Sequence, residues 1–108
     1  MTDDTILKGK IEIDGTVYDY SGIFFFDFEL DKWYDKWGNC RGFDHKTFKL
    51  NSVDVEDYDV KYEDGSYPDD DCIDAIHDKF YEIVVNGEPS IDNKIEKYVL
   101  SEYWENWN

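Results

Sequence analysis

Alternating apolar and polar residues near the start of the chain predict a β-hairpin. The dipeptide Asp14-Gly15 separates the runs ILKGKIEI and TVYDY. Asp-Gly is a preferred pair for a two-residue hairpin turn, because both central positions need positive φ. Closing the chain on that turn pairs Ile13 with Thr16, Ile11 with Tyr18, and Lys10 with Asp19.

The same alternation continues after Gly22. The run IFFFDFEL predicts a half-buried strand, with Phe24, Phe26, Phe28 and Leu30 on the inner face. The next segment, DKWYDKWGNCRG, is typical of a loop, and we expect Trp33 and Trp37 to anchor it. The runs KTFKL and SVDVEDYDVKY then predict two more strands.

In the run SVDVEDYDVKY, the alternation of apolar and polar residues shifts by one position partway along. Val53 and Val55 share one face, whereas Tyr58, Val60 and Tyr62 define the apolar face afterwards. A shift of one residue is what a β-bulge produces, so we place a bulge at Glu56-Asp57. The shift turns four carboxylates away from the core: Asp54, Glu56, Asp57 and Asp59.

Helical spacing replaces the alternation after the turn YEDGSYP. We expect a helix from near Cys72 to Gly87, capped by the acids of the preceding DDD run, where negative charge also meets the positive end of the helix dipole. Its apolar stripe has spacings of three and four and consists of Ile73, Ile76, Phe80, Ile83 and Val84. The opposite face carries a row of acids: Asp71, Asp74, Asp78 and Glu82.

A second helix is predicted from Pro89 and Ser90 onward. Its early apolar stripe consists of Ile91, Ile95, Tyr98 and Val99, and its later stripe of Leu100, Tyr103, Trp104 and Trp107. Because the two stripes point in nearly opposite directions, the helix either breaks near Ser101 or presents one face to another molecule. We therefore expect one α+β domain over residues 1–108, with an antiparallel sheet of about four to five strands followed by two C-terminal helices packed on it.

Composition supports a folded protein and limits its partners. The 108 residues include 20 aromatics, so the chain can form a core, yet its formal charge is −16. An acidic surface disfavours direct binding to nucleic acid or to an anionic membrane. We see no secretion signal or membrane span, and Cys40 and Cys72 have no metal-type spacing. We therefore expect a cytoplasmic protein with reduced thiols.

The acids are concentrated in one part of the sequence. Residues 51–74 hold ten carboxylates and a single cation, Lys61. Carboxylates four apart on a helix are separated by roughly 6 Å, and alternate strand residues by about 6.5 to 7 Å, close to the phosphate step of a nucleic-acid strand. A compact chain of this length would be about 34 Å across, a length over which duplex DNA carries on the order of 20 charges.

Other interpretations remain open. Runs of charged residues commonly form solvated faces that keep a protein soluble. The row Asp74, Asp78, Glu82 contains no lysine, however, and like charges at this spacing repel each other and destabilise the helix. Asp69 to Asp74 are able to hold Mg²⁺, although no metal motif surrounds them. His77 and His45 have no catalytic partner in the sequence, and we expect His77 to be a core or boundary histidine with its hydrogen bonds satisfied. We expect no enzyme activity, cofactor or metal.

The acidic segments SVDVEDYDVKYEDG and DDDCIDAIHDKFYEIV resemble those of small acidic phage proteins. DAIH within them is similar to the acidic helical face of phage anti-restriction DNA mimics. This resemblance implies an inhibitor of a host nuclease, restriction enzyme or CRISPR effector, acting in the host bacterial cytoplasm. The pattern is also similar to that of acidic immunity proteins, which neutralise nuclease toxins.

The favoured hypothesis is an inhibitor that docks on the basic nucleic-acid-binding site of a partner protein. The alternatives are an immunity protein, and a phage or bacterial assembly component in which the C-terminal aromatic stripe makes a homodimer. Trp104 and Trp107 are candidates for an apolar anchor or for core positions. We expect the partner to contact Asp54, Glu56, Asp57, Asp59, Asp71, Asp74, Asp78, Glu82, Trp104 and Trp107.

Overall fold

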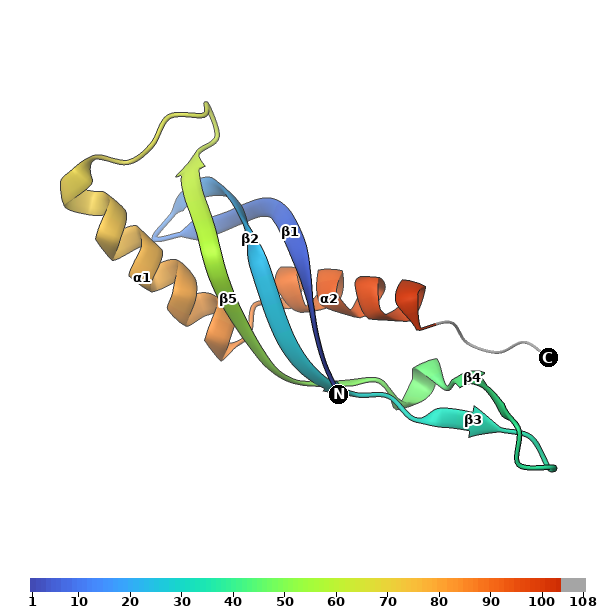
Figure 1. Ribbon diagram of the computed structural model, residues 1–108. Helices are drawn as coiled ribbons and strands as arrows, with labels where there is room; N and C mark the ends of the chain where they lie inside the picture. Colours follow the sequence, from blue (N-terminus) through green and yellow to red (C-terminus); the bar gives the residue numbers. More distant parts are fainter. Residues whose placement is uncertain (104–108) are drawn as a thin grey trace.

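The computed structural model describes residues 1–103 and shows an α+β fold in which a long, curved antiparallel sheet precedes two helices (Figure 1). The main sheet has the strand order β1-β2-β5, with β1 (Thr2–Ile13), β2 (Thr16–Glu29) and β5 (Lys49–Tyr62). A second, two-stranded sheet joins β3 (Lys32–Tyr34) and β4 (Cys40–Phe43). The predicted fold class is confirmed.

The β1–β2 hairpin has the register that its turn dictates. Asp14 and Gly15 both have positive φ, at 51° and 84°. The three predicted pairs are present, and the ladder continues to the pair Thr2 and Asp27. The run IFFFDFEL covers the second half of β2 and the residue that follows it, and its four inner residues are buried as expected: Phe24, Phe26, Phe28 and Leu30.

A β-bulge interrupts the pairing of β2 with β5. Ser21 pairs with Asp59 and Ile23 pairs with Glu56, so Gly22 alone faces two residues of β5, Asp57 and Tyr58. Asp57 has φ of 49°, a left-handed conformation that is uncommon for a residue other than glycine. The change of phase agrees with the sequence, and the bulge lies at Asp57-Tyr58, one residue after the predicted pair Glu56-Asp57. The bulge confirms that the acids on either side of it point away from the core.

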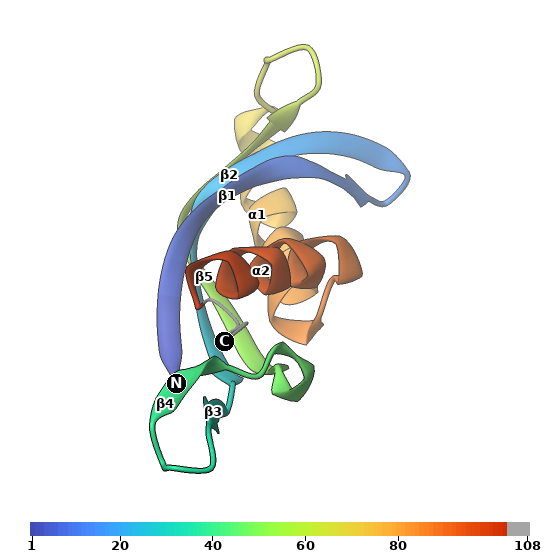
Figure 2. The same cartoon turned by 90° about the vertical axis from the view of Figure 1, so that its right-hand side faces the viewer.

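Two helices cover the concave side of the sheet. Helix α1 (Asp70–Asn86) packs against β5, and Figure 2 shows β1 and β2 curving around α2 (Pro89–Glu102). Phe80 of α1 is fully buried among the rings of Tyr20, Phe24 and Tyr58. The buried residues of α2 belong to the predicted early stripe: Ile91, Ile95 and Val99.

The helix ends differ in detail from the expectation. α1 begins at Asp70, and Asp69 occupies its N-cap without a side-chain hydrogen bond, so the predicted carboxylate cap is wrong, although Asp70 and Asp71 lie in the first turn. Gly87 ends α1, as predicted, with φ of 105° and its N–H donating to the carbonyls of Ile83 and Val84. α2 ends at Glu102, close to the expected break at Ser101.

Two predictions about the middle of the chain are wrong. The runs KTFKL and SVDVEDYDVKY do not form separate strands, because a short 3-10 helix, η1 (His45–Thr47), precedes the single strand β5. The segment expected to be an anchored loop is the β3–β4 hairpin, which projects from the body of the protein (Figure 1). Its aromatics do not anchor it, since Trp33 is 46% and Trp37 is 72% exposed.

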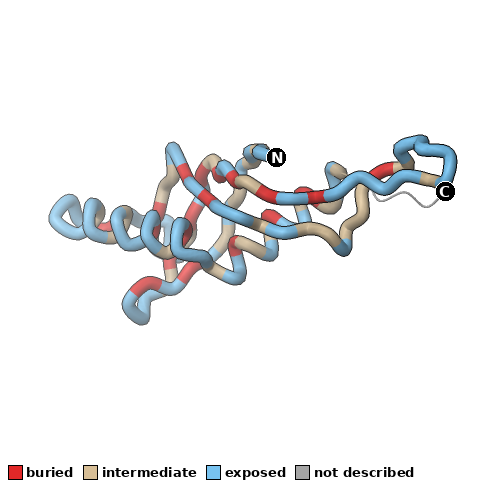
Figure 3. Tube along the Cα trace, turned by 90° about the horizontal axis from the view of Figure 1, so that it is seen from below, coloured by how far each residue is buried: buried red, intermediate tan, exposed pale blue. Residues whose placement is uncertain are grey.

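The molecule is elongated rather than compact. Its extents are 62 × 22 × 22 Å and its radius of gyration is 17.2 Å, whereas a compact chain of this length has a radius near 13 Å. Buried residues follow the contact between sheet and helices, while the β3–β4 end is largely exposed (Figure 3). Within residues 1–103, neither helix is long and apolar enough to cross a membrane.

Candidate functional site

The β5 carboxylates singled out from the sequence lie at the surface. Asp54 and Glu56 share the outer face of the sheet, opposite the inward-facing Val53 and Val55. Asp57 is exposed within the bulge. Asp59 is half-buried and accepts a hydrogen bond of 2.8 Å from the Tyr67 hydroxyl. The strand therefore presents its carboxylates outward on both sides of the bulge.

The α1 carboxylates form one row along the exposed side of the helix. All four are exposed, and they lie opposite the face that buries Phe80 and Val84. Successive members three or four residues apart rise by roughly 4.5 to 6 Å along the helix axis. The members of the row are Asp71, Asp74, Asp78 and Glu82.

Two tyrosines connect the carboxylates of the strand with those of the helix. Interaction of the Tyr81 hydroxyl with the Asp54 carboxylate raises the pKa of Tyr81, and the charge of Glu56 adds to the effect. Burial raises the pKa of Tyr58, and the nearby charge of Asp78 raises it further. The rings of Tyr58 and Tyr81 stack with their centroids 6.5 Å apart. Carboxylates of β5 and α1 thus converge on one pair of rings.

We call the eight carboxylates of β5 and α1 the acidic surface; its members are Asp54, Glu56, Asp57, Asp59, Asp71, Asp74, Asp78 and Glu82. None of them lies within 4.0 Å of a cationic nitrogen among the described residues. Residues 54–82 hold twelve carboxylates and two lysines, a net charge of −10 out of −16 for the whole chain. An even distribution would place about −4 in a segment of this length. The negative charge is therefore concentrated on β5, α1 and the loop that joins them.

Neither of the two lysines of this segment forms an ion pair with the acidic surface among the described residues. Lys79 forms an ion pair with Asp14 of the β1–β2 turn. Lys61 lies across the sheet from Asp19, in a hollow that is also lined by Lys8, Lys10 and Asp59. Asp59 therefore marks the border where the acidic surface meets a region of mixed charge.

Elongation changes the comparison with DNA. Over 62 Å, duplex DNA carries about 36 charges, more than twice the net 16 of this chain. The expected match of whole-molecule charge density is therefore wrong, because it assumed a compact shape. The comparison that remains is local, between the carboxylate spacing on α1 and the phosphate spacing of one nucleic-acid strand.

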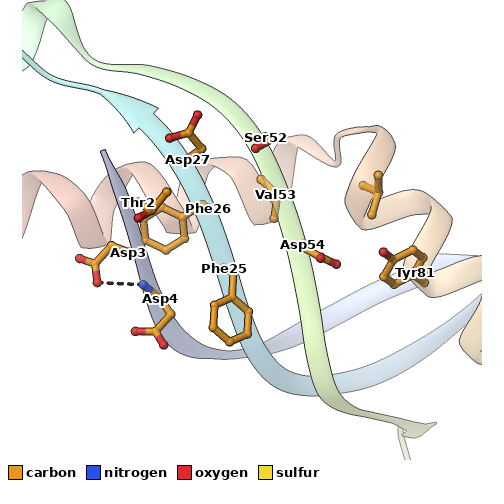
Figure 4. A pocket seen from close by; sticks show the side chains of 11 residues that line it. Thr2, Asp3, Asp4, Phe25, Phe26, Asp27, Ser52, Val53, Asp54 and Tyr81 are labelled. Carbon is orange, nitrogen blue, oxygen red and sulfur yellow. Dashed lines mark hydrogen bonds between the residues drawn. The ribbon is translucent and has the colours of Figure 1, made fainter.

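An open hollow of about 700 Å³ lies beside the acidic surface, on the outer face of the sheet (Figure 4). Its floor includes Phe25 at the centre of the sheet, and α1 contributes Tyr81 and Val85 from beyond the β5 edge. The three are 36%, 39% and 45% exposed. The carboxylates that line the hollow are Asp3, Asp4, Asp27 and Asp54. This combination of apolar and acidic groups suits a cationic, apolar ligand segment.

Other candidate sites show less organisation. No group of three or more metal-ligating side chains converges within residues 1–103. Cys40 and Cys72 are exposed free thiols. His77 is a boundary residue, as expected, and its ring packs against Tyr58, but its Nε2 is buried without a partner in the described part of the chain, so the expectation of satisfied hydrogen bonds is wrong.

The later stripe of the second predicted helix is only partly described. The ring of Tyr103 packs edge-on against Phe28 and Phe43, and its carbonyl oxygen lies 2.6 Å from Nε2 of His45. This residue therefore closes the core rather than facing outward. Trp104 and Trp107 lie outside the described residues, and their assignment as an anchor or as a homodimer contact stays a prediction.

Sequence reasoning missed the tyrosines and the hollow. Tyr81 lies three residues after Asp78, so helical spacing alone could have placed it beside the acidic row. Phe25 alternates with the buried Phe24 and Phe26 and so faces outward, but the hollow that it lines with Tyr81 and Val85 depends on how α1 crosses the β5 edge, which periodicity does not reveal.

A scan against protein-family models and searches of curated proteins and of solved structures found no match.

Proposed function

We propose that this protein is an acidic inhibitor that occupies the positively charged nucleic-acid-binding site of a partner protein. The partner class is a nuclease, or a restriction or CRISPR effector. The observation that carries the proposal is the row of unpaired carboxylates on α1 together with those of β5. Such a surface would be attracted to a basic cleft by the same long-range field that guides a nucleic acid there.

Two features support binding rather than a purely solubilising role. A solubilising surface is expected to mix charges of both signs, whereas this one has no cation within ion-pairing distance in the described structure. The helix also bears the cost of like charges at i, i+4, which destabilise an exposed helix by a few tenths of a kcal/mol per pair. Repulsion among these carboxylates is relieved when a cationic partner protein binds them, so such a surface suits a binding role.

The proposed mechanism needs no catalysis by this chain. The carboxylates approach the phosphate sites of the partner and replace the counterions that surround its lysines and arginines. Binding is therefore expected to weaken as salt rises, because exposed charges are screened beyond about 8 to 10 Å. Inhibition follows because nucleic acid and inhibitor cannot occupy the same cleft.

The test is capture from host lysate followed by competition. Immobilised protein is expected to retain a nucleic-acid-binding protein that elutes when either salt or duplex DNA is added. The identity of that protein separates a restriction or CRISPR target from a toxin nuclease, which an immunity protein would bind. Retention of a partner that DNA does not displace would count against occupation of a nucleic-acid site.

One observation favours a second candidate, an assembly protein that contacts copies of itself. The β3–β4 hairpin exposes three large aromatics, Trp33, Tyr34 and Trp37, and exposed aromatic clusters mark interaction surfaces. Self-association in the absence of any other protein, combined with no capture of a basic partner, would favour this candidate.

A further inference from the structure

The β3–β4 hairpin differs from the rest of the protein in both charge and exposure. Residues 31–49 contain five cations and three acids, a net charge of +2 in a chain of −16. Trp33, Tyr34 and Trp37 are 46%, 56% and 72% exposed. Near the turn, the ammonium of Lys36 lies 4.5 Å from the ring centroid of Trp37. The hairpin thus projects a cationic, aromatic end from an acidic body.

The hollow on the outer face of the sheet has the complementary character. Its apolar floor of Phe25, Tyr81 and Val85 is exposed, and carboxylates of β1, β2 and β5 line it. No lysine or arginine is among the described residues that line it. An aromatic side chain flanked by a cation therefore fits this hollow in both polarity and charge.

Hairpin and hollow lie next to each other in the fold. The hairpin joins Glu29, the last residue of β2, to Lys49, the first residue of β5. The hollow is bordered by Asp27 and Ser52, close to those same strand ends. Within one chain the hairpin extends beyond the ends of β2 and β5, away from the body of the sheet (Figure 1). Across a two-fold axis near these strand ends, each hairpin could reach the hollow of the other copy.

We propose that the protein forms a closed homodimer in which the β3–β4 hairpin of each copy docks in the outer-face hollow of the other. Lys36 and Trp37 lead the docking, with Trp37 over Phe25 and Lys36 near Asp54. A reciprocal contact of this kind is self-complementary and ends at two copies, as isologous interfaces do. The occupant of each hollow is the hairpin of a second copy of this chain, which supplies the required cationic and aromatic groups.

The available area is adequate for such a dimer. Large aromatics bury roughly 150 to 250 Å² each when fully covered, so three half-exposed rings offer about 300 Å² per copy. The hollow loses a comparable area, and two such contacts give about 1,200 Å², the lower end of standard stable interfaces. The dimer is therefore expected to be of moderate strength and to depend on the aromatics.

This dimer does not rest on the proposed inhibitor function. It would cover Asp54, one member of the acidic surface, and involves none of the four carboxylates of the α1 row. Its test uses the protein alone, so that failure to dimerise would leave the inhibitor proposal in place, and failure to bind a basic partner would leave the dimer in place.

The test is a charge exchange between hairpin and hollow, measured by sedimentation or light scattering over a concentration series. The unmodified protein is expected to reach twice its chain mass of 12.9 kDa. Lys36→Glu alone and Asp54→Lys alone should each weaken dimerisation at least tenfold, since both contacts of each homodimer then bring like charges together. Mixing the two variants should restore the dimer, because both contacts of the mixed pair then join opposite charges.

A second variant tests the aromatic contribution. Trp33→Ala with Trp37→Ala should abolish the dimer, while far-UV circular dichroism stays unchanged because both side chains are exposed. The proposal is overturned if the unmodified protein remains a monomer, if it assembles beyond two copies, or if the mixed charge variants stay monomeric. It is equally overturned if the double tryptophan variant still dimerises with unchanged affinity.

Discussion

Reversing two charges on the exposed row of α1 would test whether this row contacts the partner. Asp74 and Asp78 are exposed, lie one helical turn apart, and have no ion pair in the described structure. Asp74→Lys with Asp78→Lys should therefore leave the fold intact. The same replacement exchanges two attractions for two repulsions at a basic cleft.

The expected loss of affinity follows from the size of these terms. A charge pair at a partly solvated interface contributes on the order of 1 kcal/mol. Two lost attractions and two new repulsions thus sum to about 4 kcal/mol, or roughly a thousandfold in Kd. Calorimetry or biolayer interferometry with the captured partner would measure this change, together with unfolding curves to confirm that stability is unaltered.

A matched control distinguishes a specific contact from a change in net charge. Glu96→Lys with Glu102→Lys alters the total charge by the same four units, but both residues lie on the exposed side of α2. This control should reduce affinity less than tenfold at physiological salt. The reasoning would be refuted if both variants lost the same affinity, or if the α1 variant kept its affinity.

Three further changes test the framework that holds the acidic surface in place. Phe80→Ala removes the fully buried ring that fixes α1 to the sheet and should cost about 3 to 5 kcal/mol, measured by chemical denaturation. Gly22→Ala places a Cβ 2.9 Å from Cβ of Tyr58 at the bulge, and should lower stability by about 1 to 3 kcal/mol; an unchanged denaturation midpoint would contradict that clash. Burial raises the pKa of Asp92, and the charge of Glu88 raises it further. The neutral carboxyl is therefore favoured in the folded state, and this stabilisation is lost as pH rises through the folded pKa. Asp92→Asn should therefore raise the melting temperature at pH 7 and change it little at pH 3, whereas an equal effect at both pH values would contradict this assignment.

Much of the fold could be predicted because local rules agree with it. The Asp14-Gly15 turn fixes the hairpin register by its φ requirement. The change of phase at Glu56-Asp57 reveals the bulge, since a strand alternates with a period of two. Both α1 faces follow from helical spacing.

The overall shape could not be predicted in the same way. The β3–β4 hairpin has tryptophans whose pattern is equally consistent with burial, and only the direction of the chain after Glu29 leaves them exposed. The hollow depends on Tyr81 reaching over the edge of β5 to Asp54, a contact between elements. The elongated shape follows from such arrangements and alters the charge density on which the comparison with DNA depended.

Zero-length carbodiimide crosslinking of the complex, followed by mass spectrometry, would show whether the α1 row contacts the basic cleft of the partner. This reagent joins carboxylates to amines that are in contact, so it reports which acids meet the partner. The partner's crosslinks are expected to come from Asp71, Asp74, Asp78 and Glu82, and to reach lysines of its nucleic-acid-binding cleft. Crosslinks arising mainly from carboxylates of α2 or of residues 31–44, with none from α1, would contradict the proposed inhibitor function.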